Sequence, residues 1–180
     1  TAAVVLAIGA SRAFAALQIE PDWLWSAPTV AAAFGALYAL LEHRAWRWRW
    51  VRALGIVNTP VVEGVYVGRL QAPPWRPGVP ATDRPATVSI QQTWKTISIT
   101  FAIDQPASST SRSMTAELLR LGRDTAQLTY TYTNNVTPGV ADPDMHDHDG
   151  TARLVILETG AATGRYYNFR GRQGSLTLQR

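Results

Sequence analysis

The stretch TAQLTYTYTN, residues 125–134, decides the fold class. Threonine or glutamine occupies every second position, and the positions between them hold mostly apolar or aromatic side chains. Alternation with a period of two is typical of a β-strand that buries one face. Leu128, Tyr130, Tyr132 and Asn134 therefore share one face of this strand.

The same alternation recurs from residue 61 to the C-terminus, which predicts eight strands. The other seven are residues 61–71, 86–93, 96–104, 113–121, 151–158, 162–170 and 174–180. The links LGRD, ETGA and GRQG are typical of hairpin turns, whereas residues 73–85 and 135–149 are expected to be longer loops. Sequential hairpins without a helical stretch predict an eight-stranded, antiparallel, up-and-down β-barrel.

The interior of such a barrel is either packed with side chains or holds one small ligand. The face of residues 97–103 is wholly apolar, as expected of a packed wall. On two other faces, aromatic side chains are followed by Asn or Arg, in residues 128–134 and 166–170. These faces resemble a lined pocket more than a closed core. A core with tyrosine hydroxyls at its rim stays open as the alternative.

The N-terminal third of the chain contains two apolar segments. Residues 23–41 carry no charged side chain, and a helix of this length spans about 28 Å, close to the thickness of a bilayer's hydrocarbon core. Residues 1–19 are similarly apolar apart from Arg12, and a short turn-forming segment joins the two. We therefore predict an anchor of two transmembrane helices within residues 1–57, followed by a barrel domain at 58–180.

The stretch HRAWRWRWVR, residues 43–52, predicts the orientation of this anchor. Arginines cluster directly after the second apolar segment, and basic residues favour the cytoplasmic side of a membrane. Trp46, Trp48 and Trp50 are expected among the lipid headgroups, with the arginines near anionic lipid. Both chain ends and the barrel should then be cytoplasmic. A nucleic-acid-binding arm is the less favoured alternative.

Small residues four positions apart indicate close helix packing within the hairpin or between protomers. Gly9 with Ala13, and Ala31 with Gly35, have this spacing. Arg12 lies in the middle of an apolar segment, so we expect it to face a partner helix or water.

Composition and motifs argue against catalysis. The chain has no cysteine, and it lacks a GxSxG elbow, a P-loop and a strand-linked GxGxxG. The cluster DPDMHDHDG, residues 142–150, pairs His146 with His148 but is also typical of an acidic surface loop. We therefore predict no catalytic residue, no metal site and no enzyme. A membrane-bound hydrolase that uses His146 or His148 stays open as an alternative. The net charge of +4, with Lys95 as the only lysine, suits an anionic ligand.

Five stretches occur in an order that matches a known family. They are IQQTWKTISI (90–99), SSTSRSMTAEL (108–118), LTYTYTN (128–134), HDGTARLVI (148–156) and GRYYNFRGRQGSLTL (164–178). Together with a two-helix anchor before NTPVVEGVYVG (58–68), they resemble the CD-NTase-associated two-transmembrane effectors of CBASS anti-phage defence, which carry a STING-like, SMODS-associated β-barrel.

The resemblance implies a function. In that family a cytoplasmic, lipocalin-like barrel recognises a cyclic dinucleotide made by a partner nucleotidyltransferase. The membrane helices then form homo-oligomers and damage the bacterial inner membrane, which aborts the infection. It implies a regulatory ligand, but no cofactor, metal, DNA or RNA. Whether the ligand activates or silences the effector stays open. The alternative is a membrane-tethered, lipocalin-like carrier of an apolar or lipid ligand.

Inward position and membership of the five stretches select nine candidate ligand-binding residues. They are Gln92, Trp94, Ser109, Ser111, Tyr130, Tyr132, Asn134, Tyr166 and Arg170. Tyrosines would stack on bases and Arg170 would pair with phosphate, while Gln92 and Asn134 would contact base edges. One bulge in a strand would reverse the faces assigned here.

Overall fold

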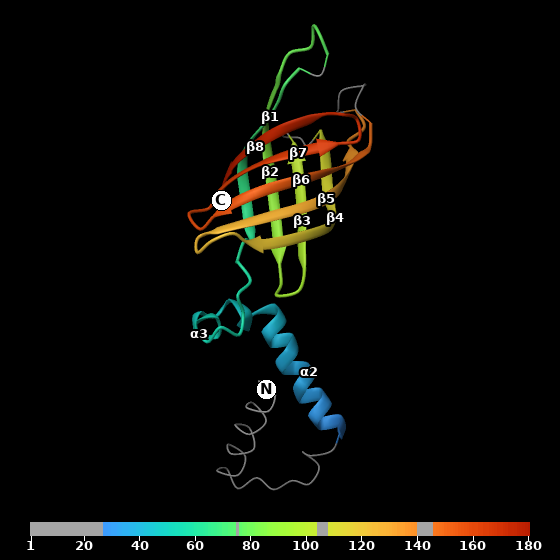
Figure 1. The fold of residues 1–180 in the computed structure, drawn as a ribbon. Coiled ribbons are helices and arrows are strands. Elements are labelled where there is room, and N and C mark those ends of the chain that lie inside the picture. The colour runs from blue at the N-terminus through green and yellow to red at the C-terminus, as the bar shows by residue number, and fades with distance from the viewer. Residues whose placement is uncertain (1–26, 75, 104–107, 140–145) are drawn as a thin grey trace, which may run out of the picture. The chain divides into compact units, whose positions relative to one another are not determined.

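The structure is a computed structural model that describes residues 27–74, 76–103, 108–139 and 146–180 (Figure 1). The chain divides into two compact units, Thr1–His43 and Arg44–Arg180. In the first unit the described residues form helix α2, Ala27–His43. Four large apolar side chains on α2 are exposed, namely Val30, Phe34, Leu37 and Leu40. Among the described residues, no helix is both long enough and apolar enough to cross a membrane.

The predicted helix-packing residues fall partly outside the described chain. Gly9, Arg12 and Ala13, with the whole first apolar segment, lie outside the described residues. Ala31 and Gly35 lie on α2. Among the described residues, no atom outside the helix's own backbone lies within 4 Å of the position that a Cβ on Gly35 would occupy. The role of all five residues in assembly remains a prediction.

The second unit contains a closed antiparallel barrel of eight strands in sequential order. The strands are β1 (Gly64–Ala72), β2 (Thr82–Gln92), β3 (Ile97–Ile103), β4 (Ser109–Arg120), β5 (Thr125–Val136), β6 (His148–Leu157), β7 (Ala161–Asn168) and β8 (Gln173–Gln179). Each strand pairs with the next, and β1 closes the ring by pairing with β8. The predicted eight-stranded up-and-down barrel is therefore confirmed.

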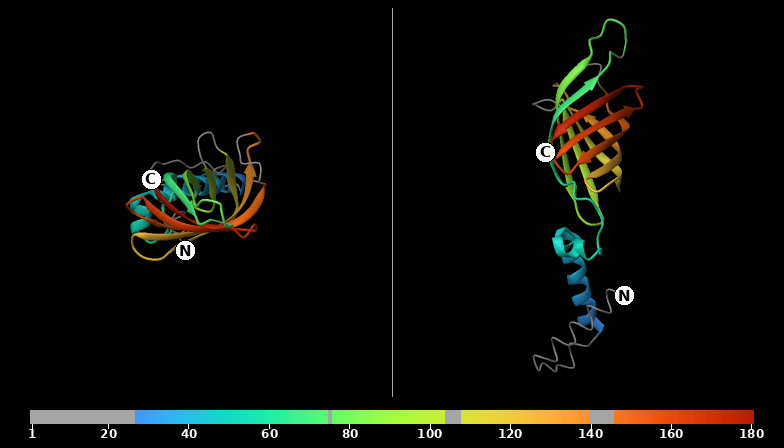
Figure 2. Two further views of the ribbon diagram at one scale, coloured as in Figure 1. Left: turned by 90° about the horizontal axis from the view of Figure 1, so that it is seen from above. Right: turned by 60° about the vertical axis from the view of Figure 1, so that its left-hand side comes forward.

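Strand β2 starts inside the segment predicted to be a loop, residues 73–85. Strands β1 and β2 stay paired up to Ala72 and Thr82, and an ion pair of 2.7 Å joins Arg69 to Asp83 across them. Figures 1 and 2 show the resulting β1–β2 arm, residues 70–84, extending beyond the other strands. Cross-strand pairing thus overrides the local preference of a Pro-rich segment for a loop.

Strand β4 begins at Ser109, four residues before its predicted start, and contains a bulge. Its register against β5 shifts between Ser113 and Thr115. Before the shift the buried residues are Ser109 and Ser111, and beyond it Ala116 is among those that pack against the core. The inward-facing positions of β4 therefore have odd numbers before the bulge and even numbers after it. Both serines precede the bulge and face the interior of the barrel.

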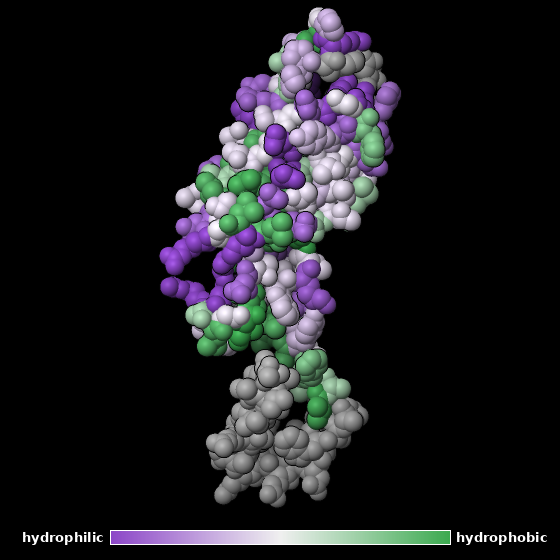
Figure 3. All heavy atoms as spheres, viewed as in Figure 1, coloured by the Kyte–Doolittle hydropathy of each residue, from purple (hydrophilic) through white to green (hydrophobic). Residues whose placement is uncertain are grey.

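One end of the barrel is packed with apolar side chains. Tyr66, Val88, Ile90, Ile99, Leu128 and Leu154 are each at most 2% exposed. The outward positions alternate with them and are mainly Thr, Ser, Arg and Gln. Most of the barrel surface on the face visible in Figure 3 is accordingly hydrophilic or neutral. The packed core fills only part of the interior, because the other end is hollow.

The basic aromatic segment before the barrel is helical. It contains a 3-10 turn, η2 (Ala45–Arg47), and a short helix, α3 (Arg49–Ala53). Trp46 is fully buried, whereas Trp48 and Trp50 are exposed. The expectation that all three tryptophans face headgroups is therefore wrong for Trp46. The ring centroids of Trp48 and Trp50 lie 5.7 Å apart and both rings are exposed, so Trp46 is the one of the three that departs from the expectation.

Candidate ligand-binding site

The hollow end of the barrel is a cavity of about 660 Å³. Residues of all eight strands line it, at the ends of β1, β3, β5 and β7 and at the starts of β2, β4, β6 and β8. The β1–β2 arm and the turn between β7 and β8 border its mouth. This volume lies within the range of pockets that bind small molecules and cofactors.

Three tyrosines give the cavity an aromatic interior. Tyr130, Tyr132 and Tyr166 all line it, and the ring centroids of Tyr130 and Tyr132 lie 6.2 Å apart at an interplanar angle of 53°. Burial raises the pKa of all three hydroxyls above the ordinary value for tyrosine. The hydroxyls therefore stay protonated at neutral pH and can donate hydrogen bonds, while the rings offer faces on which bases can stack.

Two glycines on neighbouring strands leave room for these rings. Gly150 pairs with Tyr132 across β5 and β6, and Gly174 pairs with Tyr166 across β7 and β8. A Cβ on either glycine would lie 2.5 Å from the ring of the paired tyrosine. Because contacts this short do not occur, any larger residue would displace the ring. Both glycines thus leave the space against the barrel wall that the two rings occupy.

The mouth of the cavity is basic. Arg76 and Arg84 reach it from the β1–β2 arm, and Arg170 and Arg172 reach it from the β7–β8 turn. Arg172 lies close enough to Tyr166 to lower the pKa of that hydroxyl, against the larger effect of burial. Guanidinium groups bind phosphate oxygens in a two-pronged geometry, so this mouth suits an anionic, phosphate-containing ligand.

The β7–β8 turn holds its two arginines in fixed backbone positions. The Asn168 Oδ1 atom accepts hydrogen bonds from the backbone N–H of Arg170 at 3.1 Å and of Arg172 at 3.0 Å. Gly171 lies between them with a φ of 69°, a conformation that glycine adopts without strain. The turn therefore needs no reordering of its backbone before a ligand binds.

Polar side chains on three adjacent strands, β4, β5 and β6, line another part of the cavity. Ser111 donates a hydrogen bond of 2.8 Å to Asn134 Oδ1, and Asn134 pairs with His148 across β5 and β6. The Nδ1 atom of His148 lies 2.8 Å from the carbonyl oxygen of His146 and donates to it. Ser109 lies two residues before Ser111 on the same face. We call Ser109, Asn134 and His148 the polar row.

The structure brings seven of the nine predicted residues together in this cavity. They are Ser109, Ser111, Tyr130, Tyr132, Asn134, Tyr166 and Arg170. Their contact with a ligand remains a prediction. Sequence reasoning did not select Arg76, Arg84, His148 or Arg172, which also line the cavity. Arg84 lies two residues before the inward-facing Ala86, and Arg172 lies two residues after Arg170. Because residues two apart in a strand share a face, this spacing was the signal that could have selected both arginines.

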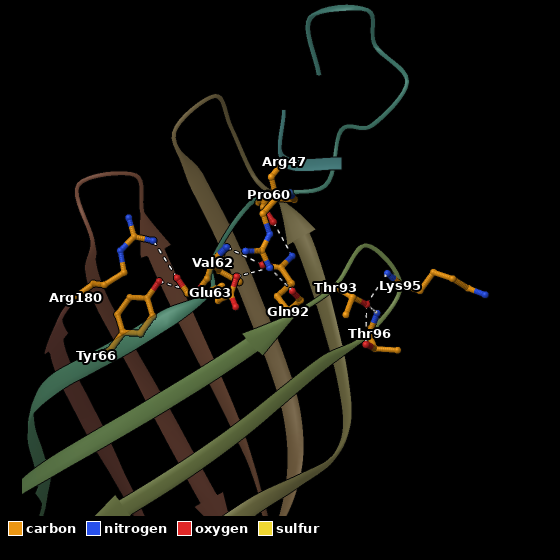
Figure 4. Close-up of polar contacts among 10 residues, drawn as sticks. All are labelled: Arg47, Pro60, Val62, Glu63, Tyr66, Gln92, Thr93, Lys95, Thr96 and Arg180. Atoms are coloured by element: carbon orange, nitrogen blue, oxygen red, sulfur yellow. Dashed lines mark hydrogen bonds and ion pairs between the residues drawn. The ribbon is translucent and has the colours of Figure 1, made fainter. Parts of the chain in front are cut away.

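Gln92 lies at the opposite end of the barrel, where β2 ends and the chain enters β1 (Figure 4). Trp94 follows two residues after the end of β2. The Gln92 side chain accepts a hydrogen bond from Val62 N–H and donates one to the Pro60 carbonyl, both at 2.8 Å. The backbone carbonyl of Gln92 accepts a hydrogen bond of 2.7 Å from the guanidinium group of Arg47, which also forms an ion pair with Glu63. These contacts occupy the amide of Gln92 within the protein itself. Trp94 is half-buried in the turn between β2 and β3.

A comparison with known protein families identifies a domain in this chain. The sequence model of a family described as "Cap15, cyclic dinucleotide receptor domain" matches residues 57–180. No curated protein matches the chain. Within the described residues, no three His, Cys, Asp or Glu side chains are grouped so that they could hold a metal ion.

Proposed function

This chain belongs to the Cap15 cyclic dinucleotide receptor family, and we propose that its barrel binds one cyclic dinucleotide within the cavity, as the sensor of a CBASS anti-phage effector. The observation that supports this most is the pairing of tyrosine faces inside the cavity with four arginines at its mouth. A cyclic dinucleotide presents two bases and two phosphates. Aromatic faces and guanidinium groups are the protein groups that bind these parts.

The proposed role is that of a sensor and not of an enzyme. The ligand would come from a partner nucleotidyltransferase and act as a regulatory signal. A tethered carrier of apolar or lipid ligands is the weaker candidate, since such a carrier would need an apolar lumen. The basic mouth and the polar row do not fit that ligand class.

We further propose that the N-terminal segments anchor the protein in the bacterial inner membrane, with the barrel in the cytoplasm. The uncharged run 23–41, the exposed apolar side chains of α2 and the arginines of residues 44–52 support this. Ligand binding would change how the anchors assemble as homo-oligomers, and the assembled anchors would compromise the membrane. Binding can act in this way only if the ligand prefers one assembly state over another.

A thermal-shift titration of the full 180-residue chain in detergent tests ligand binding. A cyclic dinucleotide at about a hundredfold its dissociation constant should add roughly 2.7 kcal/mol of stability, which raises the melting temperature by roughly 10 °C. A linear dinucleotide of the same bases serves as the control and should give a much smaller shift, because its ring is not closed. If cyclic dinucleotides of every base composition leave the melting temperature unchanged, the proposal is wrong.

Dye release from vesicles of phosphatidylethanolamine and phosphatidylglycerol tests the membrane role. The reconstituted full chain should change its rate of dye release at least severalfold when the binding cyclic dinucleotide is added. The matched control is the chain with Arg170→Ala and Arg172→Ala, which keeps the anchor but should not respond. Equal release with and without ligand, from protein shown to bind that ligand, would contradict the membrane role.

A further inference from the structure

On strands β4 and β5, buried polar atoms of Ser109 and Asn134 in the wall of the cavity lack a hydrogen-bond partner. Within the described part of the chain, neither Nδ2 of Asn134 nor Oγ of Ser109 has one. Asn134 is 3% exposed and Ser109 is 1% exposed, and both residues line the cavity. Native proteins pair most of their buried polar groups, so groups that lack a protein partner on a cavity wall are available to whatever occupies the cavity.

The orientation of the Asn134 amide is fixed before any ligand arrives. Ser111 donates its hydroxyl proton to Asn134 Oδ1 at 2.8 Å, which leaves the N–H groups of Nδ2 as the unused side of the amide. The two residues face each other across paired strands, so their backbones hold this contact in place. Asn134 therefore offers hydrogen-bond donors, and the matching ligand atom is an acceptor, such as a carbonyl oxygen or a ring nitrogen.

The polar row lies on a different side of the mouth from the arginines of the β1–β2 arm. In a closed ring of eight strands β5 lies four strands from β1, so Asn134 faces Arg76 and Arg84 across the opening. Charged guanidinium groups bind phosphate more strongly than a neutral amide does. The ring of Tyr132 lies two residues from Asn134 on the same face. A base stacked on that ring would bring its edge to the polar row.

We infer that the polar row, with Asn134 as its central donor, recognises the identity of a nucleobase, while the arginines bind the phosphates whatever bases the ligand contains. This inference rests on the proposed function and assigns base recognition and phosphate binding to different residues of the cavity. Removing a polar-row group should change the ranking of ligands that differ only in their bases. Removing an arginine should weaken all of them by a similar factor.

The test is calorimetric titration of the full chain with cyclic dinucleotides that share one linkage and contain adenine, guanine or uracil. Asn134→Leu keeps the volume of the side chain and removes the donor. It should weaken the tightest ligand about tenfold to a hundredfold and bring the panel to within about threefold of one another. Asn135→Leu, at the exposed neighbouring position, is the matched control and should leave both affinity and ranking unchanged.

Ser109→Ala provides a second test with two readouts of opposite sign. Its hydroxyl has no partner in the free protein, so removing it should leave the melting temperature unchanged or raised, while affinity for the tightest ligand falls severalfold. The inference is overturned if Asn134→Leu weakens every ligand equally or none, or if Ser109→Ala lowers the melting temperature without changing affinity. If the unmodified chain binds no cyclic dinucleotide of any base composition, the proposed function itself fails.

Discussion

Replacing Arg170 and Arg172 together with alanine should lower the affinity of the barrel for a cyclic dinucleotide by about a thousandfold. A hydrogen bond to a charged group contributes about 1.5–3 kcal/mol, and each tenfold change in affinity corresponds to about 1.4 kcal/mol. Both side chains project from a turn whose backbone N–H groups are held by Asn168, so the backbone of the turn need not be ordered when the side chains bind phosphate. Calorimetric titration of the full chain measures the effect.

The salt dependence of binding gives an independent readout of the same contacts. Affinity of the unmodified chain should fall as salt rises, because ions screen the attraction between guanidinium and phosphate. The double variant should show a shallower dependence. The control is Arg112→Ala with Arg153→Ala, which removes the same number of charges from exposed positions on β4 and β6. Similar losses of affinity in both double variants would mean that only net charge matters, and would contradict a phosphate site at the turn.

The inner wall of the cavity could be predicted from the sequence because strict alternation assigns each side chain to one face. In β5 this places Tyr130, Tyr132 and Asn134 inside once the sheet closes into a barrel. The two serines of β4 were also assigned correctly, because the bulge comes after them, between Ser113 and Thr115. Alternation was therefore sufficient to assign a side chain to the inward face wherever no bulge interrupts the strand.

The mouth could not be predicted in the same way because it depends on contacts between segments. The β1–β2 arm carries Arg76 and Arg84 to the cavity, and its pairing is stabilised by the ion pair of Arg69 with Asp83. In the sequence, neither Arg69 nor Asp83 indicates that the Pro-rich segment between them belongs to a hairpin. Alternation likewise places Gln92 inside but cannot say which end of the barrel is hollow. That depends on how the strands close into a ring.

Gln92→Leu should therefore destabilise the protein by about 2–5 kcal/mol while leaving the ligand affinity of the folded protein unchanged. The substitution keeps the side-chain volume but removes both hydrogen bonds to the chain entering β1, at Val62 N–H and the Pro60 carbonyl. Val62 is 2% exposed, so water cannot readily replace the lost partner. Each buried backbone group left unpaired costs about 1–3 kcal/mol. Urea denaturation of the full chain, followed by tryptophan fluorescence, measures the loss.

The neighbouring Gln91→Leu makes the same chemical change on the exposed face of β2 and should alter stability by less than about 0.5 kcal/mol. The pair separates the two roles proposed for Gln92. A residue that reads a base edge would lose affinity on substitution without a large loss of stability, whereas a residue that closes the barrel would do the reverse. Because Gln92 lies at the packed end and its side-chain oxygen and nitrogen both bond to the chain at residues 60–62, we expect the second result. Weakened binding with unchanged unfolding would instead place the ligand at the packed end of the barrel, next to Gln92.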